Sequence, residues 1–310
     1  MRAAVLREYG VPIADEFAAP AAGRRGAVVD VLAAGLNPVD VAICAGRFYA
    51  GKPALPCVAG REGVGMLDGE RVYFDAPLAP YGSMAEQALI DPACTYPVAP
   101  ALSDGVAVAL GISGLAAWLA LTWRAQVQEG EHVLILGASG VVGQIAVQAA
   151  KLLGAARVVA AARSATGLER CLALGADAAV SLHEGGELVT ELSTAAEGRI
   201  DVVLDPLCGE PLEAAVKAAS FGARIVQLGA GAAQQATISS ADVRGKMLSI
   251  MGHSNFAAPV EIRRGAYARL VHAACDAGLV VEVDPFELER VGEAWARLTA
   301  GSHRKIVLLP

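Results

Sequence analysis

The sequence feature that most constrains the fold is a strand-turn-helix pattern at residues 132–155, in the middle of the chain. Its first part, 132–136, is a short apolar run rich in β-branched residues, which is typical of a buried strand. Four small residues at 137–140 end this run. From residue 141 onward, apolar side chains recur at helical spacing until Gly154. The stretch therefore predicts a strand, a glycine turn and a helix.

The turn has the composition of a phosphate-binding site. Its backbone N–H groups and the helix N-terminus, worth roughly half a positive charge, favour an anion. Gly137 allows the tight turn, Gly140 lets a pyrophosphate approach the backbone, and Gly143 lets the helix pack close to the strand. The spacing is G-x-x-G-x-x-G, not the usual G-x-G-x-x-G. The flanking strand and helix therefore carry the prediction of a dinucleotide site.

Short apolar strands alternate with helical patterns from this stretch onward. The predicted strands lie at 132–136, 157–161, 178–181, 201–204, 224–228 and 247–251, and the helices at 141–153, 167–174, 187–196 and 210–221. Such alternation indicates an α/β fold with a doubly wound parallel sheet of the Rossmann type.

The first 108 residues are instead rich in strands and turns, which predicts an antiparallel barrel-like or sandwich domain. The predicted strands are 3–6, 27–33, 63–67, 71–74 and 83–90, and a helix is expected over 104–123. The tail predicts a helix at 262–277, a strand at 279–283, a helix at 288–299 and a strand at 305–309. We therefore expect a β-rich domain of residues 1–113 and 253–310 and a dinucleotide-binding domain of residues 114–252, with the cleft between them as the default site.

Composition excludes several classes of function. The net charge of −7 argues against nucleic acid as a partner. No apolar run is suited to span a bilayer, and the first residues do not resemble a signal peptide, so we expect a cytoplasmic protein. The six cysteines and five histidines are scattered, which suggests neither a metal site nor a disulfide framework.

The order of these parts resembles the medium-chain dehydrogenase/reductase superfamily, in its zinc-independent quinone oxidoreductase branch. The motifs that carry the resemblance are LNPVD at 36–40, GRFYAGKPALPCVAGREGVG at 46–65, GERVYF at 69–74, YGSMAEQ at 81–87, GISGLAAWLAL at 111–121, the GASGVVG turn, LGADAAVSL at 174–182, DVVLDPLCG at 201–209, RIVQLGA at 224–230 and the closing HRKIVLL. The resemblance implies a GroES-like first domain, hydride transfer from a nicotinamide, and a homodimer. Between GREGVG and GERVY the chain is shorter than the family pattern.

The resemblance also bears on metal binding. Zinc-dependent members have G-x-C-x-x-D followed by G-H-E, and here Asn37 and Arg61 stand at the cysteine and histidine positions. We therefore expect no metal. A relocated site using Cys44 or Cys57 is the alternative.

The end of the second strand favours NADPH over NADH. NAD-preferring folds place an acid there, whereas Arg163 and Ser164 stand here, and a guanidinium suits a 2′-phosphate. Arg163 could also be a solvated loop charge. The lysine that related enzymes carry a few residues on corresponds to Gly167, and Arg170 could replace it. The residues expected to contact the cofactor are Gly137, Ser139, Gly140, Val141, Val142, Gly143, Arg163, Ser164, Gly229 and Lys305.

Three residues are candidates for the chemistry. The resemblance places Asn37 beside the nicotinamide, although it could be only a turn residue before Pro38. Tyr49, with Phe48 as the competing match, could donate a proton to an enolate or form an aromatic wall. Arg61 could face the substrate or pair with Glu62 or another acid.

The expected function is NADPH-dependent reduction of a quinone or an α,β-unsaturated carbonyl without metal, with orientation and a hydrogen-bond donor supplied by the protein. One alternative is a trans-acting enoyl reductase on carrier-bound or CoA thioesters, for which Arg24 and Arg25 offer slight support. Another is a non-catalytic NADPH-binding regulatory protein, since fold similarity does not prove activity.

Overall fold

We describe residues 1–23, 26–183 and 187–310 from a computed structural model. The chain forms two compact units, one of Met1–Ser113 with Val260–Pro310 and one of Gly114–Pro259. Arg24 and Arg25 lie outside the described residues. Over the described ranges, no helix is both long enough and apolar enough to cross a membrane.

The second unit is built on a six-stranded parallel sheet. Its strands are β9 (His132–Leu136), β10 (Arg157–Ala162), β11 (Ala178–Ser181), β12 (Val202–Asp205), β13 (Arg224–Gln227) and β14 (Ser249–Gly252). They lie in the order β11-β10-β9-β12-β13-β14, which is the doubly wound dinucleotide-binding order. The predicted Rossmann sheet is therefore confirmed, each strand starting within two residues of its expected position.

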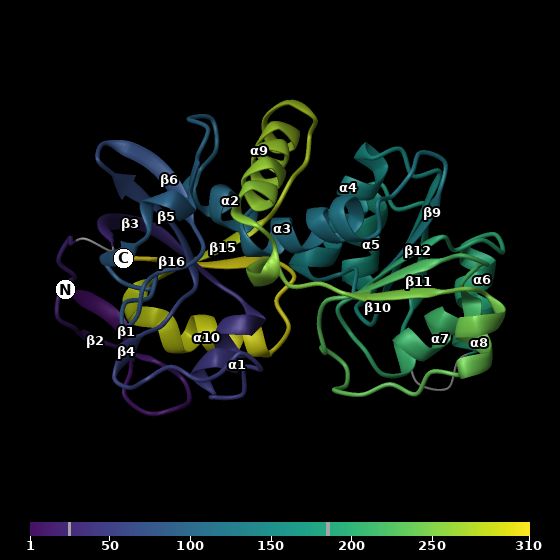
Figure 1. The fold of residues 1–310 in the computed structure, drawn as a ribbon, viewed down its shortest axis with the longest axis horizontal. Coiled ribbons are helices and arrows are strands. Elements are labelled where there is room, and N and C mark those ends of the chain that lie inside the picture. Colours follow the sequence, from purple (N-terminus) through teal and green to yellow (C-terminus); the bar gives the residue numbers. More distant parts are fainter. Residues whose placement is uncertain (24–25, 184–186) are drawn as a thin grey trace. The chain divides into compact units, whose positions relative to one another are not determined.

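Helices cover both faces of this sheet, as Figure 1 shows. On one face lie α4 (Val141–Leu152) and α5 (Ala165–Ala173), and on the other α6 (Leu188–Ala195), α7 (Glu210–Ala218) and α8 (Ser240–Gly245). Apolar side chains of the central strands and of α6 and α7 form one buried cluster. Burial on both faces explains why these strands read as continuous apolar runs.

The first unit is β-rich, as expected. Its seven-stranded sheet contains β3 (Ala27–Leu36), β5 (Glu62–Leu67), β6 (Glu70–Phe74), β7 (Gln87–Ile90), β8 (Thr95–Pro97), β15 (Val283–Glu287) and β16 (Lys305–Leu309), and a smaller sheet contains β1 (Arg2–Leu6), β2 (Ile13–Glu16) and β4 (Cys57–Val58). The long β3 pairs with β7 through its first residues, with β5 through its middle and with β16 through its last residues. A register shift between Val31 and Ala33 accompanies this change of partners.

The short connection between β5 and β6 is a two-residue hairpin turn. Asp68 and Gly69 both have positive φ, of 51° and 85°, as a type I′ turn requires. The shortening relative to the family pattern therefore leaves a tight hairpin at this point.

The helices of the first unit include α1 (Pro38–Cys44), α2 (Asp104–Ala109), α9 (Val260–Asp276) and α10 (Val291–Thr299), and its short 3₁₀ turns include η1 (Pro92–Cys94) and η4 (Leu288–Arg290). The helix α3 (Ile112–Leu119) starts in the first unit and continues into the second. The second unit also contains the π-helical turn η2 (Ala120–Arg124) and the 3₁₀ turn η3 (Asn255–Ala257). The expected helix over 104–123 is helical in the structure except at 110–111, where the chain breaks between α2 and α3. The tail strand predicted at 279–283 is wrong, since β15 begins at Val283 and pairs in parallel with β16.

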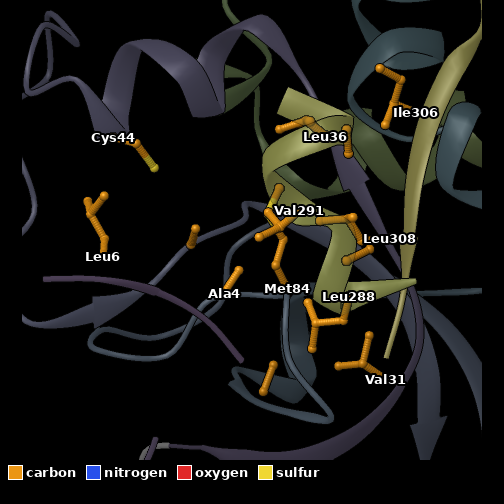
Figure 2. Close-up of a cluster of buried hydrophobic side chains, with 14 of the residues drawn as sticks. Ala4, Leu6, Val31, Leu36, Cys44, Met84, Leu288, Val291, Ile306 and Leu308 are labelled. Atoms are coloured by element: carbon orange, nitrogen blue, oxygen red, sulfur yellow. The ribbon is translucent and has the colours of Figure 1, made fainter. Parts of the chain in front are cut away.

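The core of the first unit lies between its two sheets and α10. Figure 2 shows Leu6 of β1, Cys44 of α1, Leu36 of β3 and Val291 of α10 contributing to this cluster. The tail thus supplies part of the first unit's core, which explains why residues far apart in sequence form one compact unit.

Candidate functional site

In the second unit, the glycine turn follows β9 as the sequence predicts. Gly137 has a φ of +62°, and Gly140 is the N-cap of α4. A Cβ on Gly143 would lie 2.5 Å from the Cα of Ala138, so only glycine lets α4 pack this close to the turn. Gly140 offers no side chain to cap the helix, and the first N–H groups of α4 are therefore available to an anion.

The end of β10 carries a cation and hydroxyl groups. Arg163 follows the strand and is exposed. Ser164 is the N-cap of α5, where its hydroxyl accepts the N–H of Gly167 at 3.1 Å and lies 3.1 Å from the hydroxyl of Thr166. No carboxylate occurs between Ala162 and Leu168, which suits a phosphate at this point.

Gly167 packs directly against the phosphate turn. A Cβ added there would overlap the side chain of Ser139. The chain therefore has no room at this position for the lysine of related enzymes without moving the turn. Arg170 lies one turn further along α5 and is half-buried.

Two more segments end at the same edge of the parallel sheet, where β12 and β13 finish. Asp205 ends β12 and accepts the N–H groups of Leu207 and Cys208 at 2.8 and 2.9 Å, while burial raises the pKa of its carboxyl. A Cβ on Gly229 would lie 2.7 Å from the carbonyl oxygen of Pro206, which requires a glycine there. Ligands of such folds bind beyond the carboxyl ends of the strands. Asp205 was not among the site residues expected from the sequence, although an acid at the end of a short apolar strand could have marked it.

The first unit contains a buried polar cluster centred on Glu62. This carboxylate is fully buried and accepts four hydrogen bonds, from Asn37 Nδ2 at 2.8 Å, Lys305 Nζ at 2.6 Å, Tyr73 Oη at 2.9 Å and the N–H of Ile112 at 2.5 Å. Such a set of donors offsets the cost of burying a charge. Pairing of Arg61 with Glu62 was one of the alternatives that the sequence left open, and the structure shows an ion pair between Glu62 and Lys305.

Glycines make room for this cluster. Gly35 of β3 lies opposite Glu62 of β5, and a Cβ there would overlap the carboxylate. A Cβ on Gly111 would overlap the ring of Tyr73. Gly111 also separates α2 from α3, and the N–H of Ile112 at the start of α3 donates to Glu62. The broken helix is therefore a consequence of the buried acid.

Asn37 is held on all sides by protein groups. Its amide nitrogen donates to Glu62 and, at 3.3 Å, to Asp40, while its oxygen accepts from Lys305 and from Ser113 at 3.4 Å. Its backbone N–H donates to Asp40 at 2.8 Å in a capping box that starts α1. Asn37 therefore has two roles: its side chain holds the cluster together, and it is the N-cap of α1. Lys305, which the sequence assigned to the cofactor, is 1% exposed and belongs to this cluster.

A pocket in the first unit adjoins the cluster at Asp40. Its polar lining includes Asp40, Arg61 and Tyr81, and its walls are largely apolar, with Leu6 and Cys44 among them. Figure 2 shows both of these apolar side chains. This combination of apolar walls and few polar groups is typical of small-molecule sites.

The remaining candidates lie apart from the cluster. Tyr49 is 79% exposed, in the segment after α1, and its ring packs on Phe48 at 4.4 Å. Arg61 lines the pocket and is half-buried. Burial raises the pKa of Asp75, which Arg263 and, more weakly, Arg61 lower again. Among the described residues, no group of three or more His, Cys, Asp and Glu could hold a metal ion.

Comparison with known proteins agrees with this geometry. A family model described as zinc-binding dehydrogenase matches residues 141–270. A quinone oxidoreductase of Rattus norvegicus is 30% identical, with 100% of this chain and 98% of that protein covered. The quinone oxidoreductase of Thermus thermophilus, solved also as a complex with NADPH, is 30% identical with a TM-score of 0.82 and full coverage of both chains. A mycobacterial protein solved with NADPH is 22% identical with a TM-score of 0.91, again with full coverage of both chains, and shows the shared fold.

Proposed function

The chain belongs to the quinone oxidoreductase family of the medium-chain dehydrogenase/reductase superfamily and is an oxidoreductase that uses a nicotinamide cofactor, and from this premise we propose its cofactor, substrate class and site residues. The cofactor is NADPH, and the substrate is a quinone or an α,β-unsaturated carbonyl compound. We assign the cofactor to the second unit and the carbonyl substrate to the first.

The glycine turn is the observation that carries the proposal. The close packing of Gly143 on Ala138 and the uncapped start of α4 form a seat for the pyrophosphate. The proposed pyrophosphate site also includes the neighbouring residues Ser139, Val141 and Val142. When bound, the reduced nicotinamide supplies a hydride and is oxidised, while the acceptor gains two electrons.

Arg163 and Ser164 select the phosphorylated cofactor. An exposed guanidinium at the end of β10 and a hydroxyl at the N-terminus of α5 suit a dianionic 2′-phosphate, and no carboxylate is present there to repel it. We also assign Gly229, beyond the end of β13, to the cofactor site, where its lack of a side chain makes room for the carbonyl of Pro206.

In the first unit, Asn37 is a positioning residue that does not itself donate to the substrate. Both hydrogens of its amide nitrogen are used inside the protein, on Glu62 and Asp40. We therefore assign Asn37 to holding the cluster beside the pocket, and we assign Arg61 to the pocket wall that faces the substrate. Tyr49 is highly exposed in the segment after α1, and we do not assign it as the proton donor.

Nucleotide selectivity in Arg163 variants tests the cofactor assignment. Arg163→Ala should raise the KM for NADPH about 10- to 100-fold, since a charge-assisted contact contributes roughly 1.5–3 kcal/mol. The KM for NADH should change little. Arg163→Glu should reverse the preference. Arg244→Ala removes another exposed arginine of the same unit and serves as the matched control. Equal loss with both nucleotides would contradict the assignment.

A further inference from the structure

Asp40 has a carboxyl group whose two oxygens differ in their surroundings. Oδ2 accepts from the backbone N–H of Asn37 at 2.8 Å and from its amide nitrogen at 3.3 Å. Oδ1 is buried and has no hydrogen-bond partner among the residues that the structure describes. Because Oδ2 already receives two hydrogens, the proton of the neutral acid belongs on Oδ1.

A pocket adjoins Asp40. Asp40 lines it together with Arg61, and most of the other lining groups are apolar or small. A protonated Oδ1 requires an acceptor, and a carbonyl oxygen is an acceptor only. An apolar molecule with a carbonyl group therefore matches both the walls and the acid.

Burial is the main influence on Asp40 and shifts it toward its neutral form. Burial and the neighbouring Glu62 of β5 raise the pKa of Asp40 to about 6, although the hydrogen bonds from Asn37 and the ammonium of Lys305 on β16 lower it. Cys44, one turn further along α1, has a thiol pKa raised by burial to about 12 and stays neutral. The helix α10, which also packs on α1, contributes apolar side chains to the cluster that contains Cys44.

We propose that Asp40 is the proton donor to the carbonyl oxygen of the quinone or α,β-unsaturated ketone, a proposal that rests on the reductase function given above. Once a hydride has reached a carbon of the acceptor, negative charge lies on the acceptor's oxygen. The O–H bond of Asp40 then breaks and an O–H bond forms on the acceptor, which becomes an enol. The enol of an α,β-unsaturated ketone tautomerises to the saturated ketone. The enol of a quinone becomes the hydroquinone when its new ring C–H bond releases a proton to water and its second carbonyl oxygen takes up a proton. Asp40 is left as a carboxylate and regains its proton from water.

Asp40 also has a structural role, which the experiment must separate from proton donation. Its carboxyl group is part of the capping box of α1. Asp40→Asn keeps an oxygen for the N–H of Asn37 and nearly the same volume, but it has no acidic proton. Asp91→Asn is the matched control, because Asp91 is an exposed acid that caps η1 by accepting the N–H of Ala93 at 2.9 Å.

Two measurements use the full chain and duroquinone, whose ring carbons are all substituted and therefore resist addition of cysteine thiols. The first is the rate of NADPH oxidation by duroquinone from about pH 5 to about pH 9. We expect kcat/KM of the wild type to fall about tenfold per pH unit above the pKa of Asp40. Asp40→Asn should be slower by about 100-fold and should lack this decline, whereas Asp91→Asn should match the wild type.

The second measurement is calorimetry of duroquinone binding without nucleotide, in buffers of different ionisation enthalpy. We expect the wild type to take up protons near neutral pH as Asp40 becomes protonated against the bound carbonyl. Absence of uptake by the wild type overturns the proposal, even where Asp40→Asn fails to fold. An Asp40→Asn enzyme with the wild-type rate and pH profile overturns it too. A wild type that oxidises NADPH with neither duroquinone nor an enone instead overturns the reductase function, and the Asp40 proposal with it.

Discussion

Burying a carboxyl group favours its neutral form, and burial raises the pKa of Asp40 to about 6 from an ordinary value of 3.8. At the residue scale, this shift links stability to pH. A raised pKa means that the folded protein binds the proton more tightly than the unfolded chain does. The contribution of Asp40 is therefore fully present below about pH 4 and is lost as the pH rises through about 6.

Asp40→Asn removes this titration while keeping the cap. Relative to the variant, the wild type should lose up to about 3 kcal/mol of unfolding free energy between about pH 4 and about pH 8. Urea unfolding of both proteins across this range measures the difference. A constant difference between them would contradict the burial of a titrating Asp40.

Gly167 gives a second prediction at this scale. Gly167→Ala should cost about 1–3 kcal/mol and weaken NADPH binding, because its Cβ would overlap the side chain of Ser139 in the phosphate turn. Gly265→Ala is the control, since Gly265 lies within α9 with no atom near its missing Cβ. That substitution should stabilise the protein by about 0.5–1 kcal/mol. Thermal unfolding and NADPH titration compare the two variants.

Single residues also show what sequence reasoning reaches. Gly137, Gly140 and Gly143 act through neighbours in the same short stretch, so their roles follow from local pattern. Glu62 draws its donors from Asn37 and Lys305, which lie 25 and 243 positions away. No local pattern marks such contacts, which is why Arg61 rather than Lys305 was considered as its partner.

At the element scale, the same limit explains the errors in helix and strand positions. The helical pattern over 104–123 is continuous in sequence, yet the buried Glu62 requires the N–H of Ile112 and the chain breaks at Gly111. The parallel strands β9 to β14 were predicted well because burial on both faces leaves a strong apolar signal. The short edge strands β2 and β4 have no such signal and were missed.

The Glu62–Lys305 pair joins β5 to β16 and allows an element-scale test. Lys305→Met leaves a buried carboxylate without its cation and should cost about 3–5 kcal/mol. The double variant with Glu62→Gln should recover part of this loss, giving a coupling of about 1–3 kcal/mol. Denaturant unfolding of the wild type, both single variants and the double variant provides the cycle. If the losses of unfolding free energy in the two single variants add up to the loss in the double variant, the pair contributes no coupling between β5 and β16.

At the scale of the whole molecule, cofactor binding should stabilise the folded state by mass action. A cofactor at 100 times its Kd adds about 2.7 kcal/mol. NADPH should therefore raise Tm more than NADH does at equal concentration, and Arg163→Ala should remove the difference. Thermal unfolding with each nucleotide measures this directly. Equal shifts in the wild type would contradict selection of the 2′-phosphate.

The central claim is that this chain transfers a hydride from NADPH to a carbon of a conjugated carbonyl compound. The most direct test uses NADPH deuterated at C4 of the nicotinamide, with 2-cyclohexenone as the acceptor and product analysis by NMR. Deuterium at the β-carbon of the saturated ketone is the predicted result. Reduction without deuterium at that carbon, or no reduction of any enone or quinone, would contradict the account.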